Sequence, residues 1–339
     1  MIQIDGAIGE GGGQILRTTI SLATVLGADV HIFNIRGNRP NPGLRPQHLH
    51  VIKTLSAISN ATVNGLEVNS TEVTYKPGNL KSQSLDIDIK TAGSITLLLQ
   101  SIIQSVYGQD KEFSFTIIGG TDVPWSPTLN YFRYVAIPLY KKFGIEIDMH
   151  LLKRGYYPKG GGKISFKISS KKNNHHFNLE NISNHDAIVR ITSSQIEHDL
   201  VNTQKNIIED NLRKNNISYS IENVVENTFS DGMSVLISNK SLNSYIGSDI
   251  VCNRKNIHNV GINVVRKYID EWKSGCSVDT HLSDMIVPLF VLSNSTFSFT
   301  SRSISEHFKT NLQVISKFLT FEYNIERKKP NFFKITIKP

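Results

Sequence analysis

The chain lacks the residues that hold together disulfide-stapled and zinc-binding proteins. Only two of its 339 residues are cysteines, Cys252 and Cys276, and neither belongs to a CxxC pair or stands beside a cluster of histidines. This excludes a disulfide framework, gives no support to a zinc site, and favours a reducing, cytoplasmic setting.

Long hydrophobic runs are also absent. The longest, such as residues 285–293, are far too short to cross a bilayer. The first residues, MIQIDG, have neither the basic nor the apolar region of a secretory signal. We therefore expect a cytoplasmic protein with no membrane partner.

Acidic residues are fewer than basic ones. The chain has 29 Asp and Glu against 37 Lys and Arg, which gives a net charge of +8 at pH 7. A basic chain favours a polyanionic partner such as a nucleic acid or a nucleotide. The alternative is that the charge only keeps the protein soluble.

One pattern of helices and strands recurs three times along the chain. Each copy has a helix with apolar residues at helical spacing, an alternating strand, a second helix and further short strands. The unit is βαβαββ, and three copies predict a pseudo-threefold large domain of the α/β class, in the α+β sense. The pairs of predicted helices are 13–26 with one that starts near Pro46, 92–108 with 127–144, and 281–293 with 305–319.

An insertion separates the third copy from the second. The interval between these two copies is more than twice the interval between the first and the second. The surplus lies between residues 170 and 275, where the polar stretch KKNNHH (171–176) is a linker by composition. We predict three regions: 1–184 with repeats one and two of the large domain, 185–275 as an inserted small α/β domain, and 276–339 with the third repeat.

A glycine-rich loop precedes the first helix. The stretch IGEGGGQILR (8–17) places three successive glycines where free backbone N–H groups and the helix dipole favour an anion. It matches neither the Walker A pattern nor the dinucleotide fingerprint, so the alternative is a loop that only turns the chain. Glu10 beside the glycines could hold a divalent metal, or could complement the charge of the helix N-terminus.

Three arginines follow on a short loop. Arg36, Arg39 and Arg45 lie in RGNRPNPGLRPQHL (36–49), which three prolines make stiff. Arginines held on a constrained loop suit bidentate recognition of phosphate. The alternative is a basic surface loop without a ligand.

Aromatic residues accompany glycines at two further places. In RGYYPKGGG (154–162) two tyrosines stand between basic residues, where they could stack on bases or on adenine. Trp125, in GGTDVPWSP, allows the same interpretation, but we expect a tryptophan in a tight loop to be packed.

In the third repeat both helices begin with residues that can carry chemistry. His307 stands at the start of the second helix, in SEHFKTN, although Ser305 is the better N-cap residue. A helix N-terminus disfavours imidazolium, and a neutral ring can attack phosphorus, so His307 is a candidate nucleophile. The alternative is a hydrogen-bonded structural histidine. At the start of the first helix, Asp284 could orient an imidazole or a ribose beside His281, or could be an ordinary cap.

Six motifs together carry a family likeness. In chain order they are DGAIGEGGGQILR, RGNRPNPGLRPQHL, AGSITLLLQ, GGTD, RGYYPKGGG and SEHFKTN. The chain resembles the RNA 3′-terminal phosphate cyclases of the archaeal and bacterial type. The likeness extends over nearly the whole chain and is weakest between residues 171 and 275.

The resemblance implies a ligase that uses ATP. The histidine of the family takes AMP from ATP and releases diphosphate. It then passes the AMP to an RNA 3′-phosphate, which makes RNA-3′-pp-5′-A. The neighbouring 2′-OH closes a 2′,3′-cyclic phosphate and expels AMP. The implied partners are ATP and an RNA with a 3′-phosphate end, with Mg²⁺ or Mn²⁺ as cofactor, and a homodimer is compatible with the likeness.

The resemblance also assigns roles residue by residue. His307 matches the nucleophile, and Glu10 is expected near the metal. Phosphate and RNA contacts are expected from Arg17, Arg39 and Gln47. The ATP site is expected to comprise Gln100, His281, Leu282, Ser283, Asp284 and Met285.

One departure concerns Met285, which stands where family members usually have glutamine in an A-D-Q motif. A thioether cannot donate a hydrogen bond, so the departure affects nucleotide affinity rather than the nucleophile. Two other functions stay open from sequence. One is a non-catalytic, cyclase-like RNA-binding factor in ribosome assembly, a type expected to lack the histidine that this chain has at 307. The other is a sugar-phosphate or enolpyruvyl transferase built from similar units.

Overall fold

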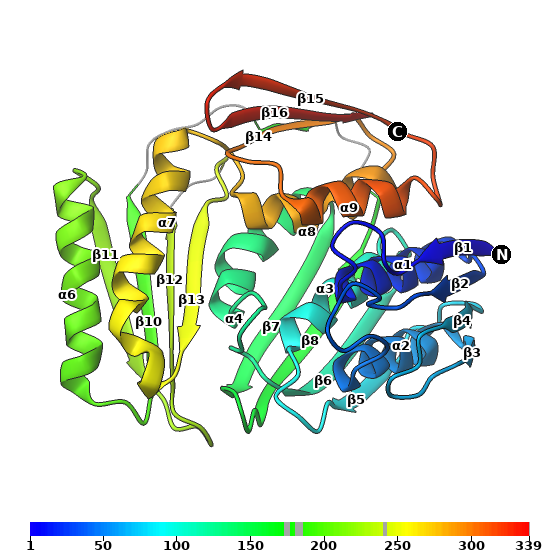
Figure 1. The fold of residues 1–339 in the computed structure, drawn as a ribbon, viewed down its shortest axis with the longest axis horizontal. Helices are drawn as coiled ribbons and strands as arrows, with labels where there is room; N and C mark the ends of the chain where they lie inside the picture. The colour runs from blue at the N-terminus through cyan, green and yellow to red at the C-terminus, as the bar shows by residue number, and fades with distance from the viewer. Residues whose placement is uncertain (173–176, 180–185, 240–242, 339) are drawn as a thin grey trace.

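The computed structural model describes residues 1–172, 177–179, 186–239 and 243–338 (Figure 1). Helices are interspersed with runs of strands, and each sheet contains both parallel and antiparallel pairs, which confirms the predicted α+β class. The predicted linker, apart from Lys171 and Lys172, and the predicted boundary between residues 184 and 185 lie outside the described residues.

The first sheet is built from the N-terminal residues. Its strands have the spatial order β1-β2-β4-β3, with β1 and β2 parallel and the other pairs antiparallel. Helix α1 (Gly13–Leu26) connects the parallel strands, and α2 (Pro46–Ser59) follows β2. Both helices begin where the sequence predicts, and each ends at a residue with positive φ, Gly27 and Asn60. The strands are β1 (Ile2–Asp5), β2 (Val30–Phe33), β3 (Thr62–Asn64) and β4 (Val73–Lys76).

The second sheet repeats this pairing, in the order β5-β6-β8-β7. Its first helix is α3 (Ile95–Ser105). The helix predicted at 127–144 is broken into α4 (Leu129–Tyr131), a π-helical turn (Phe132–Ala136) and α5 (Ile137–Lys142). The irregular turn comes just before Pro138, which has no N–H to donate to the preceding turn. The strands are β5 (Ser84–Asp88), β6 (Glu112–Gly119), β7 (Ile145–Lys153) and β8 (Gly162–Ser170).

The third sheet has the order β15-β16-β14-β9, and β9 and β14 are its parallel pair. Helices α8 (Thr280–Leu292) and α9 (Glu306–Ile315) belong to this unit. Strand β9 comes before the inserted segment in the chain, so the insertion lies between the first strand and the first helix of the third unit. The strands are β9 (Phe177–Leu179), β14 (Phe297–Ser301), β15 (Glu322–Lys329) and β16 (Phe332–Lys338).

The inserted segment forms a fourth sheet with a core of its own, on the left of Figure 1. The strand order is β11-β10-β12-β13, and α6 (His198–Lys214) and α7 (Val260–Ser274) pack against each other. Its core includes Val189, Ile208 and Val264, all fully buried. The strands are β10 (Ala187–Ser194), β11 (Tyr219–Val225), β12 (Gly232–Asn239) and β13 (Gly247–Cys252).

Helices of the three repeated units meet between their sheets (Figure 1). Helix α1 contacts α2, α3 and α9, and α8 contacts α3 and α9. Helix α8 is buried almost all round, as its apolar sequence requires. This arrangement brings the N-terminal ends of α1, α8 and α9 to one cavity.

Asp279 joins the inserted sheet to the repeated units. Its carboxylate caps α8 through the N–H of Leu282 and accepts from the N–H of Gly247 in β13, at 2.8 and 2.9 Å. The hydroxyl of Tyr131 donates to both of its oxygens, at 2.8 and 2.9 Å. One side chain therefore holds parts of the second unit, the third unit and the insertion together.

None of the helices within the described ranges is long and apolar enough to cross a membrane. Cys252 and Cys276 are free thiols, and burial raises the pKa of each, to about 12 and about 11.

Candidate functional site

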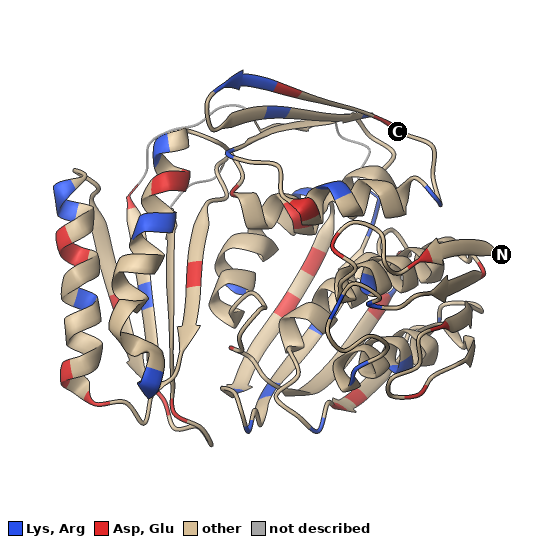
Figure 2. Cartoon of the chain, viewed as in Figure 1, with Lys and Arg blue, Asp and Glu red and all other residues tan. Residues whose placement is uncertain are grey.

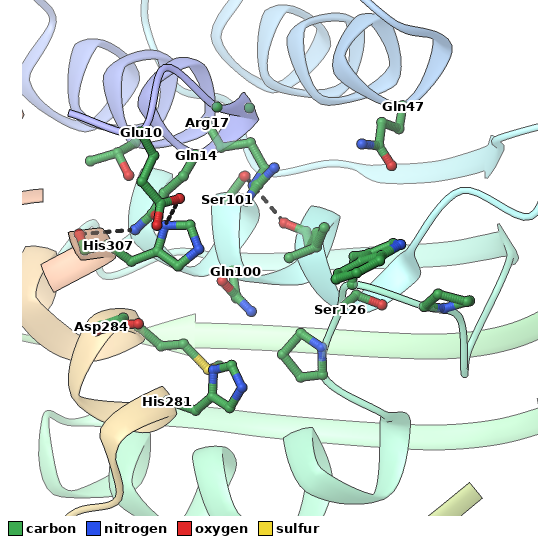
Figure 3. Close-up of a pocket in the computed structure, with 18 of the residues that line it drawn as sticks. Glu10, Gln14, Arg17, Gln47, Gln100, Ser101, Ser126, His281, Asp284 and His307 are labelled. Atoms are coloured by element: carbon green, nitrogen blue, oxygen red, sulfur yellow. Dashed lines mark hydrogen bonds and ion pairs between the residues drawn. The ribbon is translucent and has the colours of Figure 1, made fainter. Parts of the chain in front are cut away.

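A cavity of about 1160 Å³ lies between the helices of the three units and the inserted sheet. Figure 3 shows its wall, to which α1, α3, α8 and α9 all contribute. Nine of the eleven residues to which the family resemblance assigns a role line it: Glu10, Arg17, Arg39, Gln47, Gln100, His281, Asp284, Met285 and His307. They come from distant parts of the chain.

The other two residues, Leu282 and Ser283, do not line the cavity. Both are fully buried in the first turn of α8. The N–H of Leu282 donates to Asp279, and the hydroxyl of Ser283 donates to the carbonyl of Thr280 at 2.7 Å. On this helix it is the neighbouring positions 281, 284 and 285 that reach the cavity.

His307 lies in the first turn of α9 and is 43% exposed, so a ligand in the cavity can reach its ring. Ser305 is the N-cap, as the sequence predicts, and its Oγ accepts the N–H of Phe308 at 2.9 Å. The Nδ1 atom of His307 lies 2.9 Å from Oε2 of Glu10 (Figure 3). Because an ionised carboxylate can only accept, Nδ1 carries the hydrogen, and Nε2 of a neutral ring keeps its lone pair.

The glycine loop reaches α9 because it has no side chain at Gly9. This residue has φ +54°, and a Cβ there would lie 2.3 Å from Oγ1 of Thr310. The same closeness recurs at Gly13, where a Cβ would lie 2.3 Å from Nε2 of His48. Glu10 is thus brought to His307 by a loop in which a side chain at Gly9 would collide with α9 and one at Gly13 would collide with His48 of α2.

The imidazole of His307 is held in its neutral form. Burial lowers the pKa of His307 below its usual value, and Glu10 partly opposes this by raising it. The nearby charges of Arg17 and Arg39 lower the pKa further. At neutral pH the ring therefore has the lone pair that a nucleophile needs.

Arg17 stands on the wall of the cavity. Among the described residues, no hydrogen bond or ion pair involves its guanidinium, and burial lowers the pKa of Arg17 to about 10. A cation that is desolvated and unpaired is costly, and an incoming anion relieves that cost. The side chains of Gln47 and Gln100 also have no hydrogen-bond partner among the described residues.

Asp284 connects α8 to the start of α9. The hydroxyl of Ser305 donates to its Oδ1 at 2.5 Å, and Nδ2 of Asn311 donates to its backbone carbonyl at 2.8 Å. Burial raises the pKa of Asp284 to about 7, against the hydrogen bond from Ser305. Asn311 also accepts from Thr18 of α1 at 2.9 Å, so three helices are tied together beside His307.

Glu10 fits the expected divalent metal as a single protein ligand. Within the part of the chain that the structure describes, no group of three His, Cys, Asp or Glu converges. Mg²⁺ commonly takes one or two carboxylates and completes its octahedron with phosphate and water oxygens. Glu10 is 30% exposed and already has Nη2 of Arg39 3.6 Å from its Oε2, so it can supply one such oxygen beside a phosphate.

The aromatic residues are not where the sequence suggested. Trp125 was expected to be packed, but it is 99% exposed and stands on the rim of the cavity. In RGYYPKGGG, Arg154 is buried in an ion pair of 2.6 Å with Asp122, and Tyr156 is fully buried. Neither lines the cavity, so they offer no face to an adenine or a base bound there.

The insertion supplies cavity residues that the sequence did not predict. Asp249 of β13 and Lys267 of α7 both lie on the wall. Oδ2 of Asp249 accepts the N–H of Thr128 at 2.6 Å, and burial raises the pKa of its carboxyl. No local signal marks these two residues, because only the folded chain brings the insertion to the cavity.

Basic side chains surround the site. Figure 2 shows Lys and Arg along α7 on the left of the view and around α1 and α2 on the right. Arg36 and Arg45 also line the cavity. The guanidinium of Arg36 donates to the carbonyl of Gly43, and that of Arg45 donates to the side-chain oxygen of Asn69, so both bond to neutral oxygens. The wall therefore carries more positive charge than its carboxylates neutralise, as a polyphosphate ligand requires.

Known proteins resemble this chain over its full length. The model of the family described as RNA 3′-terminal phosphate cyclase matches residues 8–325. A protein of that name from Saccharolobus solfataricus is 38% identical over 341 residues, covering 99% of this chain and 100% of its own. Proteins of the same name from Methanosarcina barkeri and Pyrococcus abyssi are 37% and 34% identical over 339 residues, with 99% of this chain and 100% and 98% of their own length covered. With these matches and the cavity that gathers its motifs, the chain belongs to the RNA 3′-terminal phosphate cyclase family.

Proposed function

We propose that this protein is an ATP-dependent RNA 3′-terminal phosphate cyclase, a ligase that forms a phosphoric ester bond. The observation that carries the proposal is the environment of His307. Its ring is accessible, its pKa is lowered by burial, and its Nδ1 faces Glu10, which leaves Nε2 to attack. Full-length relatives at 34 to 38% identity carry the name of this activity.

In the first step Nε2 of His307 attacks the α-phosphorus of ATP. The N–P bond forms as the bond to the β-phosphate oxygen breaks, and diphosphate leaves. The ring becomes cationic and keeps its hydrogen on Nδ1, where the carboxylate of Glu10 at 2.9 Å stabilises the charge. Arg17 and Arg39 are the cations on the wall that can receive the phosphates.

In the second step the RNA 3′-phosphate attacks the same phosphorus. The N–P bond breaks, the electron pair returns to Nε2, and RNA-3′-pp-5′-A forms. The 2′-OH then attacks the RNA phosphorus, loses its proton and expels AMP, which leaves a 2′,3′-cyclic phosphate. Adenylylation makes this closure feasible because a phosphate monoester has no good leaving group of its own.

The nucleotide is expected between α3 and α8. Gln100 offers an amide that has no hydrogen-bond partner in the described part of the chain, and His281, Asp284 and Met285 line the cavity beside it. The buried carboxyl group of Asp284 is suited to hydrogen-bond a ribose hydroxyl of the nucleotide. Glu10 would supply one oxygen to Mg²⁺ or Mn²⁺, which when bound would draw charge from the phosphate oxygens.

The test is incubation of the protein with ATP labelled at the α-phosphate. We expect one label per chain that survives alkali and is released by acid, as a phosphoramidate is. Addition of an oligoribonucleotide with a 3′-phosphate should discharge the label, and the same oligonucleotide with a 3′-OH should not. Absence of label with either Mg²⁺ or Mn²⁺ would instead favour a cyclase-like binding factor.

We place the reaction in the cytoplasm, because Cys252 and Cys276 are free and belong to no disulfide.

A further inference from the structure

Trp125 has an unusual combination of exposure and backbone conformation. Its side chain is 99% exposed, and its φ is +67°, a region that bulky residues rarely occupy. Both features cost free energy, and the exposed ring makes no packing contacts with the described residues that would offset this cost. A strained, exposed aromatic residue on the rim of a functional cavity points to a ligand that covers it.

The loop that carries Trp125 is held firmly on both sides. Thr128 donates its N–H to Asp249 of the insertion at 2.6 Å. The carbonyl of Pro127 accepts from Oγ1 of Thr96 at 2.8 Å, and the hydroxyl of Ser126 donates to the carbonyl of Val123 at 3.0 Å. The ring is therefore presented at a fixed place, which is how a stacking platform avoids the entropy cost of ordering on binding.

This part of the rim lies away from the nucleophile. In Figure 3, Ser126 and Gln47 are on the side of the cavity opposite His307 and Asp284, with Gln100 between them. A ligand that has its reacting phosphate at His307 and continues past Gln100 leaves the cavity at Trp125. An RNA substrate, which has further nucleotides beyond its 3′ end, has to continue in this way.

Cations also line the cavity that such an RNA would enter. Arg36, Arg45 and Lys267 line the same cavity, and none of the three has a carboxylate partner among the described residues. Arg36 and Arg45 come from the loop before α2, and Lys267 comes from α7 of the insertion. Alternation of an aromatic face with cations is typical of surfaces that bind single-stranded nucleic acid.

We propose that Trp125 is a stacking platform for a base of the RNA substrate, and that the inserted domain helps to form this subsite. The inference rests on the proposed function, because it assumes that RNA enters the cavity. Stacking on an indole accepts any base, so the subsite would bind RNA ends without regard to their sequence.

The first experiment separates the two half-reactions in three variants. In Trp125→Ala we expect the KM for a 3′-phosphorylated oligoribonucleotide to rise about tenfold, while protein labelling with ATP keeps its KM. Trp125→Phe, which keeps an aromatic face, should recover most of the loss. Tyr323→Ala is the control, because Tyr323 is an exposed aromatic residue on β15, outside the cavity.

Two outcomes of this experiment would overturn the inference. An unchanged KM for RNA in Trp125→Ala would show that no base uses the ring. A raised KM for ATP in protein labelling would show that the ring serves the adenine of ATP instead. Neither outcome would affect the proposed function, which fails if the wild-type protein takes no label or if RNA with a 3′-phosphate does not discharge that label.

The second experiment does not depend on catalysis. The chain has two tryptophans, and Trp272→Phe leaves Trp125 as the single tryptophan, whose emission is excited selectively at wavelengths that tyrosine does not absorb. The change is mild, because the indole N–H of Trp272 is buried and has no hydrogen-bond partner among the residues that the structure describes. We expect the 3′-phosphorylated oligonucleotide to quench the tryptophan fluorescence saturably. The oligonucleotide concentration that gives half of the maximal quenching should rise with salt concentration. RNA binding without quenching would overturn the inference.

Discussion

The Nδ1 atom of His307 lies 2.9 Å from Oε2 of Glu10, although the two residues come from opposite ends of the chain. Gly9 makes this contact possible because it lets the N-terminal loop lie against Thr310 of α9. The contact fixes which nitrogen of the ring is free. In the proposed reaction it also places a negative charge where the adenylylated ring would become positive. The chemistry of the site therefore depends on the pairing of the first and third units.

Glu10→Gln should change the pH profile of protein labelling. The carboxylate raises the pKa of His307, so its removal should lower that pKa and move the acid limb to lower pH. The sign follows because labelling is lost as pH falls through the pKa and the ring becomes protonated. The maximal rate should fall by roughly 10- to 100-fold, since a charge-assisted hydrogen bond to the cationic ring is lost.

Glu306→Gln is the matched control for that experiment. Glu306 also lies in the first turn of α9, but it is exposed and pairs with Lys309 at 2.6 Å rather than with His307. Its replacement should leave the acid limb unmoved. An acid limb that stays in place in Glu10→Gln, or moves to higher pH, would contradict the role given to Glu10.

Arg17→Met should make the ligand-free protein more stable and its ATP binding weaker. The guanidinium of Arg17 is desolvated without a partner among the described residues, which lowers its pKa to about 10. An apolar side chain of similar length should therefore raise the free energy of unfolding by roughly 1–2 kcal/mol. Thermal denaturation with and without ATP measures both effects.

The contrast with wild type is the decisive part of that measurement. ATP should raise the Tm of the wild-type protein much more than that of Arg17→Met. Arg213→Met on α6 serves as control, because Arg213 is 65% exposed in weak ion pairs, and its change should stay within about 0.5 kcal/mol. A destabilised Arg17→Met protein with normal ATP binding would refute the prediction.

Met285→Gln should alter nucleotide affinity only modestly. Met285 lines the cavity and is 7% exposed, and the glutamine amide can hydrogen-bond a nucleotide where the thioether cannot. A single neutral hydrogen bond is worth about 1 kcal/mol, so the KM for ATP in protein labelling should fall by no more than about tenfold. The maximal rate should not change, and a large loss of rate would show that Met285 acts on the chemical step.

Asp279→Ala should destabilise the protein by roughly 3 kcal/mol. The change removes the N-cap of α8 and leaves the hydroxyl of Tyr131 and the N–H of Gly247 buried without an acceptor. Denaturation in urea measures the effect. Asn253→Ala is the control, since its side chain caps only a short, exposed turn, and the loss there should be about 1 kcal/mol or less. Equal losses of stability in the two variants would contradict the role of Asp279 in linking the second unit, the third unit and the insertion.

Local patterns in the sequence predicted the elements that depend on local physics. The bounds of α1 follow from apolar spacing, and the start of α2 follows from Pro46. The cap at Ser305 follows from residue type. Prediction failed where a long-range contact decides the structure. Strand β9 has only three residues, and its place in the third sheet depends on pairing with β14 across the whole insertion.

The same distinction holds for the site. His307, Glu10 and Arg17 belong to motifs, and they meet in the cavity. Asp249 and Lys267 reach it through the packing of the inserted sheet, which no pattern in the sequence reveals. Trp125 was expected to be packed because tryptophan usually is, and the structure instead holds its loop in a strained conformation with the ring outside.

The most direct test of this account is to locate AMP on the adenylylated protein. The protein is labelled with ATP and digested at alkaline pH, the modified peptide is identified by mass spectrometry, and the coupling between phosphorus and nitrogen-15-labelled histidine identifies the bonded ring nitrogen. We predict AMP on Nε2 of His307 and none on the His307→Ala protein. AMP on Nδ1, or on any other residue, would contradict the arrangement in which Glu10 holds Nδ1 and leaves Nε2 free to attack.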